Sequence, residues 1–201
     1  MKRIITIVAL LVMFVSMDAR AQFSLNLQAG WNQNMASGFS NNHYVGLCNS
    51  IDVMYTPQFC GGKLSFGVSQ NGVFFWATDP DFVYTEPTPD VSKFFLTGAK
   101  LRYDFSDARV HPYISVLAGM ADVRSNSVLD IAAYEAGNFS FVGNCVFSTE
   151  KRYFGINPEV GVSVGKMYFG LGYMLPKKWE ERGISYKYSH LQLIVGVRLG
   201  K

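Results

Sequence analysis

Apolar and small polar residues alternate along the segment that follows residue 21. The apolar set is Phe23, Leu25, Leu27, Ala29 and Trp31, and the polar set is Ser24, Asn26, Gln28 and Gly30. A side-chain period of two is typical of a β-strand whose two faces meet different surroundings. The same alternation recurs between His190 and Leu199 near the C-terminus. Both stretches, the one after residue 21 and the one near the C-terminus, are therefore predicted to be strands.

Six further strands are predicted between these two. Their approximate ranges are 44–56, 63–76, 93–105, 112–124, 152–164 and 167–175. Several are about 13 residues long, whereas strands of soluble sheets usually have about 5–6 residues. A tilted strand that crosses a bilayer needs about 9–11 residues, so the length favours a membrane protein.

The connecting segments alternate in length. The short ones are 57–62, 106–111 and 165–166, and the long ones are 33–43, 77–92, 125–151 and 176–187. Outer-membrane barrels have short periplasmic turns and longer external loops. The pattern predicts an all-β fold, a closed eight-stranded antiparallel up-and-down transmembrane β-barrel, with both termini on the periplasmic side. The longest connector is expected to contain an extended hairpin beyond the membrane.

The first 21 residues have the layout of a secretory signal peptide. Lys2 and Arg3 precede an apolar run over 4–15, and Ala19-Arg20-Ala21 forms a small-residue cleavage pattern. The apolar run is shorter than the roughly 20 residues that a membrane-spanning helix needs. We therefore expect a signal peptide over 1–21 and one barrel domain over 22–201, exported to the outer membrane.

The polar faces of the predicted strands carry few charges. A soluble barrel is apolar inside and charged outside, and a membrane barrel reverses this arrangement. Aromatic residues make up 15% of the chain and charged residues 16%, against roughly 25% charged residues in an ordinary soluble domain. The apolar faces are therefore expected to contact lipid. A soluble periplasmic barrel that binds an apolar ligand remains the alternative.

Two groups of residues follow from this orientation. Aromatic residues near predicted strand ends are expected to form interfacial girdles, and they are Trp31, Tyr55, Trp76, Tyr103, Phe105, Tyr173 and Trp179. Charged residues predicted to point into the lumen form a lumen charge cluster, made of Asp52, Lys100, Arg102, Asp104, Glu159 and Arg198. Because an eight-stranded barrel is only wide enough for side chains, these charges must pair. We expect a salt-bridged plug around Glu159 with Lys100 and Arg102; a narrow path for small solutes or ions is the alternative.

Several stretches resemble a known family. They are Gly98-Ala99-Lys100-Leu101-Arg102-Tyr103-Asp104-Phe105, Pro112-Tyr113-Ile114, Phe154-Gly155-Ile156-Asn157-Pro158-Glu159-Val160-Gly161 and Leu193-Ile194-Val195-Gly196-Val197-Arg198-Leu199. The chain resembles the small outer-membrane β-barrel domain proteins of Gram-negative bacteria, a porin-like group related to the eight-stranded barrel of outer membrane protein A. The resemblance implies outer-membrane lipid and the barrel-assembly machinery as partners. It also implies a structural or surface-interaction role, with a monomer expected and the ligand of the external loops left open.

Candidate chemistry is sparse. Ser189 and His190 are neighbours, so in a strand they point to opposite faces and cannot act as nucleophile and base. Cys48, Cys60 and Cys145 match no zinc pattern, although two of them could form a disulfide after export. The formal net charge of +3 is not concentrated on one face, as nucleic-acid binding would require. We expect no enzyme activity, no cofactor, no metal and no nucleic-acid partner.

Overall fold

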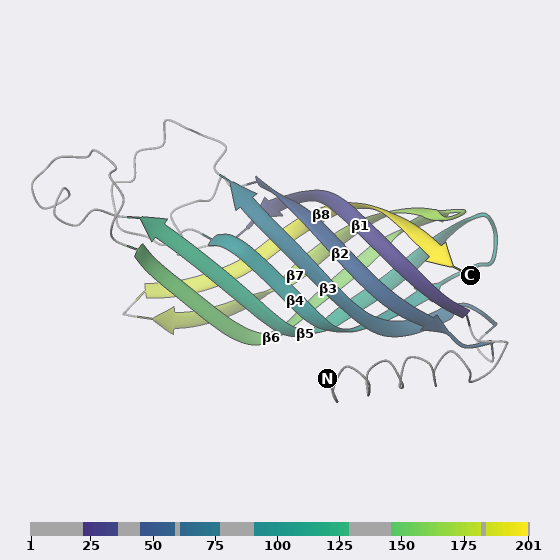
Figure 1. Ribbon diagram of the computed structural model, residues 1–201, viewed down its shortest axis with the longest axis horizontal. Coiled ribbons are helices and arrows are strands. Elements are labelled where there is room, and N and C mark those ends of the chain that lie inside the picture. The colour runs from purple at the N-terminus through teal and green to yellow at the C-terminus, as the bar shows by residue number, and fades with distance from the viewer. Residues whose placement is uncertain are drawn as a thin grey trace, which may run out of the picture.

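The computed structural model describes residues 22–35, 45–58, 61–76, 91–128, 146–181 and 184–200, and the expected signal segment lies outside these ranges. Eight antiparallel strands form a closed barrel in sequence order, which confirms the predicted fold (Figure 1). The strands are β1 (Gln22–Asn34), β2 (Val45–Thr56), β3 (Leu64–Trp76), β4 (Val91–Asp104), β5 (Val110–Val128), β6 (Val146–Val164), β7 (Met167–Glu181) and β8 (Ile184–Gly200). Among the described residues, no helix has the length and hydropathy that a transmembrane helix needs.

Pairing of the first and last strands closes the barrel. The β1–β8 ladder runs from Ser24 opposite Gly200 to Asn34 opposite His190, so the start of β1 and the end of β8 lie at one end of the barrel (Figure 1). The tight β6–β7 turn lies at this same end, where Gly165 has a φ of 63°. Glycine adopts this left-handed conformation without the steric cost of a side chain. We call this end the terminal end and the other the external end.

Side chains alternate between the lumen and the outer surface as the sequence predicts. Large apolar side chains such as Ile51 and Phe154 are 55% and 63% exposed on the outside, whereas Ser24 and Asn26 are buried inside. Soluble monomers rarely expose contiguous apolar patches larger than a few hundred Å². An apolar band that surrounds the barrel is the surface that a bilayer covers.

The wall is higher along β5 to β8 than along β1 to β4 (Figure 1). β5 continues to Val128 and β6 begins at Val146, so the predicted strands 112–124 and 152–164 were too short. The predicted loop over 176–187 was wrong, because β7 and β8 continue through it to Glu181 and from Ile184. Strands that extend beyond the bilayer need no lipid-facing apolar side chains. Their sequences therefore lack the alternation of apolar and polar residues, and a prediction based on alternation assigns them to loops.

The ladder between β6 and β7 is short. It extends only from Glu159 opposite Gly172 to Val164 opposite Met167. Beyond these pairs, the rest of β6 is paired with β5, and β7 is paired with β8 with a register shift between Met174 and Lys177. In the described chain, therefore, the external halves of β6 and β7 face each other without a backbone ladder.

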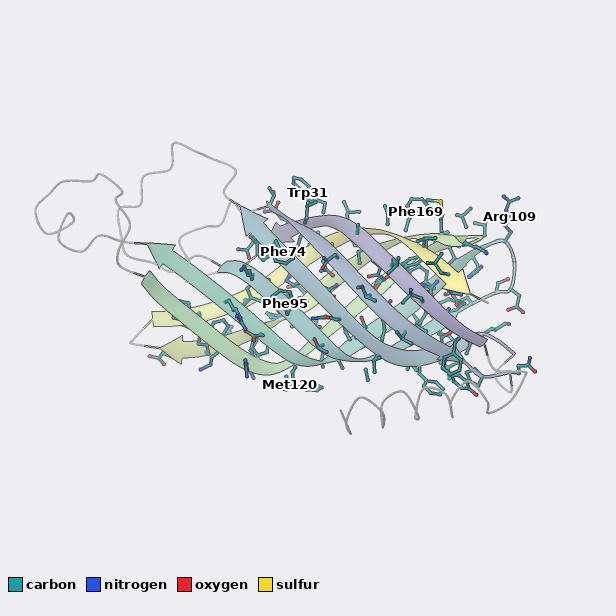
Figure 2. All side chains as sticks on the ribbon, in the orientation of Figure 1. Trp31, Phe74, Phe95, Arg109, Met120 and Phe169 are labelled. Atoms are coloured by element: carbon teal, nitrogen blue, oxygen red, sulfur yellow. The ribbon has the colours of Figure 1, made fainter. Side chains whose placement is uncertain are left out.

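Outward aromatic rings lie in two bands. At the terminal end, the ring of Tyr55 lies 5.3 Å from that of Phe23 and 5.3 Å from that of Phe66. At the external end, Phe74 and Phe95 are 5.7 Å apart, as Figure 2 locates them. Phe74 follows Phe66 by eight positions (74 − 66), which is about 26 Å along a strand and about 20 Å along an axis tilted by about 40°. This separation is close to the height of about 25 Å typical of a lipid-facing apolar band.

The residues predicted for the girdles divide three ways. Trp31, Tyr103 and Phe105 are exposed on the outer surface and Tyr173 is half-buried. The side chain of Trp76 lies outside the described part of the structure. Trp179 was assigned wrongly, because its half-buried ring packs on the interior cluster. The register shift beside Pro176 reverses the alternation of β7 and turns this ring inward.

Candidate functional site in the barrel lumen

Lys100 of β4 is shared between two carboxylates from opposite parts of the wall. Its Nζ lies 2.8 Å from Oδ2 of Asp52 on β2 and 3.4 Å from Oε2 of Glu159 on β6. The other oxygen of Asp52 accepts hydrogen bonds from the hydroxyls of Ser50 and Ser69, at 2.8 and 2.6 Å. All three charged side chains are at least nine-tenths buried. A single ammonium group therefore links three strands across the lumen.

Asp104 holds a second group of charges nearer the terminal end. Nη2 of Arg102 donates to its Oδ1 at 2.8 Å, and Nη2 of Arg198 on β8 donates to its Oδ2 at 3.2 Å. Arg102 also donates to the hydroxyl of Ser163 on β6 at 2.6 Å. Nε2 of His111 lies 3.3 Å from Asp104 but without the geometry of a hydrogen bond. Both oxygens of this carboxylate are thus used.

The buried side chain of Tyr113 connects the two groups, and Tyr168 lies beside Arg102. The hydroxyl of Tyr113 on β5 donates to Oε1 of Glu159 at 2.5 Å. The guanidinium of Arg102 lies over the same ring, 3.7 Å from its centroid, and 5.0 Å from the centroid of Tyr168. A cation over a desolvated aromatic face gains roughly 2 kcal/mol. Tyr113 therefore contacts both groups: its hydroxyl binds Glu159 of the Lys100 group, and its ring lies under Arg102 of the Asp104 group.

The expected pairing of Arg102 with Glu159 is wrong. The structure places all six predicted lumen residues inside the barrel but divides them into two layers: Arg102 belongs with Asp104, and only Lys100 reaches Glu159. Alternation identifies the face of a strand but not the height at which side chains from distant strands meet. Lys100 and Arg102 are two positions apart, or roughly 6–7 Å along the strand, which is enough to give them different partners.

Replacing Tyr113 with phenylalanine should lower the free energy of unfolding by about 1.5–3 kcal/mol, because the substitution removes a hydrogen bond to a buried charged group. The change is measured from urea unfolding in lipid vesicles. Tyr103→Phe is the matched control, since Tyr103 lies on the outer surface. Equal effects of the two substitutions would contradict this role for the hydroxyl of Tyr113.

A layer of amide side chains lies above the charges. Nδ2 of Asn157 donates to Oε1 of Gln192 at 2.9 Å, and Nε2 of Gln192 donates to Oδ1 of Asn71 at 3.1 Å. All three residues are buried. The amide layer (Asn71, Asn157 and Gln192) thus crosses the lumen from β3 through β8 to β6.

The external half of the lumen is apolar and aromatic, which the sequence did not reveal. The aromatic layer consists of Phe75, Phe94, Tyr153, Trp179, Tyr186 and Tyr188, packed with Val73, Leu96 and Met174. Phe94 stacks on Tyr188 at 5.2 Å between ring centroids, and Trp179 stacks on Tyr186 at 5.6 Å. Phe94 and Phe95 are consecutive, so the alternation that marks other strands is lost at this point.

Ser189, His190 and Cys48, the remaining candidate residues that the structure describes, have separate surroundings. His190 is buried, with Nδ1 2.8 Å from the hydroxyl of Tyr188, whereas the hydroxyl of Ser189 donates to the carbonyl of Met35 at 3.2 Å. The thiol of Cys48 is free and buried, and Cys60 and Cys145 lie outside the described residues. Within the described ranges, no cluster of His, Cys, Asp and Glu side chains is arranged to hold a metal ion.

Comparison with solved structures identifies the fold. Neisserial surface protein A is 18% identical to this chain, with 89% of this chain and 97% of the other aligned at a TM-score of 0.57. The chain has the fold of the small eight-stranded outer-membrane barrels. Ail, the attachment invasion locus protein of Yersinia pestis, solved with the heparin analogue sucrose octasulfate, aligns at 12% identity over 90% of this chain and 99% of its own, with a TM-score of 0.43. No family model matches the sequence, and no curated protein matches it.

The lumen of an eight-stranded barrel is just wide enough for side chains or for one small ligand. Here three kinds of layer occupy it in order from the terminal end: the paired charges, the amide layer and the aromatic layer. Hydrogen bonds and ion pairs within the first two layers link side chains from β2, β3, β4, β6 and β8 across the lumen.

Proposed function

We propose that this protein resides in the outer membrane as a closed barrel with a structural or surface-interaction role. Lys100, buried between Asp52 and Glu159, is the observation that carries the closed lumen. A water-filled pore would solvate these three groups, whereas here they satisfy one another. The role at the surface falls to the external connections, because loops on a rigid scaffold commonly carry recognition.

Outer-membrane residence is supported by the exterior of the barrel. The apolar band lies between two bands of aromatic rings, which is the arrangement that a bilayer and its interfaces require. The basic and apolar start of the sequence supports export through a cleaved signal peptide. Heat-modifiability of the protein in purified outer membranes tests residence: the unboiled barrel should migrate anomalously on a gel. Recovery in the soluble periplasmic fraction without detergent would contradict it.

Planar-bilayer recordings test whether the lumen is closed. The purified protein should show no large, steady conductance, because we propose that the paired charges and the amide layer block an aqueous path through the lumen. As a comparison, simultaneous Asp52→Ala, Lys100→Ala and Glu159→Ala substitutions remove the most tightly paired side chains from the lumen. If the unmodified protein conducts steadily and as well as this variant, the closed lumen is wrong and the same residues line a narrow channel.

A further inference from the structure

We propose that the external half of the β6–β7 seam is a lateral opening that admits an acyl chain of an outer-leaflet lipid into the aromatic layer. The inference rests on the proposed membrane residence. The first observation is the backbone ladder, which stops at Glu159 and Gly172 although both strands continue well beyond these residues. The ladders between the other neighbouring pairs of described strands are longer than the one between β6 and β7.

Proline explains where the ladder stops. Val164 and Met167 flank a two-residue turn, so their backbone N–H and C=O groups face each other. Every second residue of β6, counted back from Val164, therefore directs its backbone groups toward β7, and Pro158 is one of these. Proline has no N–H to donate. In the next pair beyond Glu159 and Gly172, Pro158 can accept a hydrogen bond from the N–H of Tyr173 but cannot donate the second one.

The same proline limits the cost of an open seam. An unpaired backbone N–H in the hydrocarbon core costs several kcal/mol. Pro158 has no such group at the deepest position of the seam. Arg152, the next outward-facing residue beyond Phe154 on β6, marks the level where charged side chains begin. Water and lipid headgroups reach the unpaired backbone from Arg152 outward, and Phe154 is the last outward residue beside the acyl chains.

The outer side of the seam belongs to the lipid-covered surface. Phe154 on β6 is 63% exposed, and Leu171 and Leu175 on β7 are 44% and 41% exposed. Phe154 and Leu175 flank the unpaired edges, and Leu171 lies in the paired part of the ladder just below them. Whatever approaches the seam from outside therefore comes from the bilayer, and at this depth the bilayer presents acyl chains.

The inner side of the seam is apolar and is held by a flexible side chain. A methyl group placed on Gly155 of β6 would lie 2.6 Å from Cε of Met174 on β7 and 3.3 Å from Cδ1 of Leu96. Met174 therefore covers the gap with an unbranched thioether, which adapts readily to irregular apolar spaces. Tyr153 and Trp179, with ring centroids 6.1 Å apart, face each other further up the same seam. Displacement of Met174 opens a path into the aromatic layer.

The depth of entry is limited by the amide layer. Asn157 and Gln192 close the lumen directly below the seam through their 2.9 Å hydrogen bond. An acyl chain cannot replace these hydrogen bonds, so it stays in the external half. The site thus accepts an apolar chain from the outer leaflet and excludes it from the charged layers.

Tryptophan quenching by lipids with brominated acyl chains tests the opening. The three native tryptophans are removed by Trp31→Phe, Trp76→Phe and Trp179→Phe. Single reporters are then introduced in two neighbouring pairs, Tyr153→Trp with Phe154→Trp at the seam, and Tyr168→Trp with Phe169→Trp in the fully paired half. In each pair the first residue is buried inside and the second is exposed outside.

Both outward reporters should be strongly quenched. Tyr153→Trp should lose roughly half as much fluorescence as Phe154→Trp, whereas Tyr168→Trp should lose only about a tenth as much as Phe169→Trp, because a paired wall excludes lipid. Pro158→Val supplies the missing N–H and should reduce the quenching of the Tyr153 reporter to the level of the Tyr168 reporter. Pro112→Val, which lies outside the seam, should leave that quenching unchanged.

The outcomes separate the opening from membrane residence. If Phe154→Trp is quenched but Tyr153→Trp is as protected as Tyr168→Trp, the barrel is in the bilayer and the lateral opening is wrong. Protection of both outward reporters would overturn membrane residence itself. Protection of Tyr153→Trp together with chemically cross-linked dimers would show that a second copy covers the seam instead of lipid.

Discussion

Replacing Lys100 with methionine should lower the free energy of unfolding by about 3–5 kcal/mol, the usual cost of breaking a buried ion pair by removing one partner. The substitution keeps most of the side-chain volume but leaves Asp52 and Glu159 as uncompensated charges in the lumen. Urea unfolding in lipid vesicles measures the loss. Lys93→Met on the same strand is the matched control, because Lys93 is exposed.

A triple variant separates charge balance from packing. When Asp52→Asn and Glu159→Gln accompany Lys100→Met, no buried charge is left unpaired, and most of the stability should return. Failure of this neutral variant to recover stability would show that the shape of Lys100, rather than its charge, holds the three strands together.

The second large effect concerns the lipid face. Ile51→Arg should destabilise the barrel by about 2–4 kcal/mol, because it places a charge near the middle of the apolar band. Ile51 is 55% exposed, so the same substitution on a water-facing surface would be nearly neutral. Val110→Arg is the control: Val110 is 58% exposed at the terminal end, where an interfacial arginine costs about 0–1 kcal/mol. Equal tolerance of both arginines in vesicles would contradict the membrane orientation.

Alternation was sufficient to predict the fold where each strand has one polar and one apolar face. The segment from Phe23 to Trp31 is the clearest example, and its two faces point outward and inward as expected. Two features of the strands escaped prediction for physical reasons. Two consecutive phenylalanines, Phe94 and Phe95, conceal which one faces the lumen, and Pro176 accompanies a register shift that no period of two anticipates.

The lumen was predictable in composition but not in connectivity. The sequence indicates which charged residues point inward, because the alternation within a single strand decides which face each side chain occupies. Whether Glu159 meets Lys100 or Arg102 depends on the register of strands that are far apart in the chain, which is set by the closed barrel as a whole. The β6–β7 seam escaped prediction for a similar reason: Pro158 is visible in the sequence, but the strand toward which its missing donor points is not.

The two ends of the chain meet in a long ladder, from Ser24 opposite Gly200 to Asn34 opposite His190, whereas β6 and β7 share only a short one. Local opening of the wall is therefore expected mainly between β6 and β7. The pairing of β1 with β8 holds the first and last strands as firmly as any others. Among the described strands, amide hydrogen exchange should accordingly be faster in the external halves of β6 and β7 than in β1 and β8.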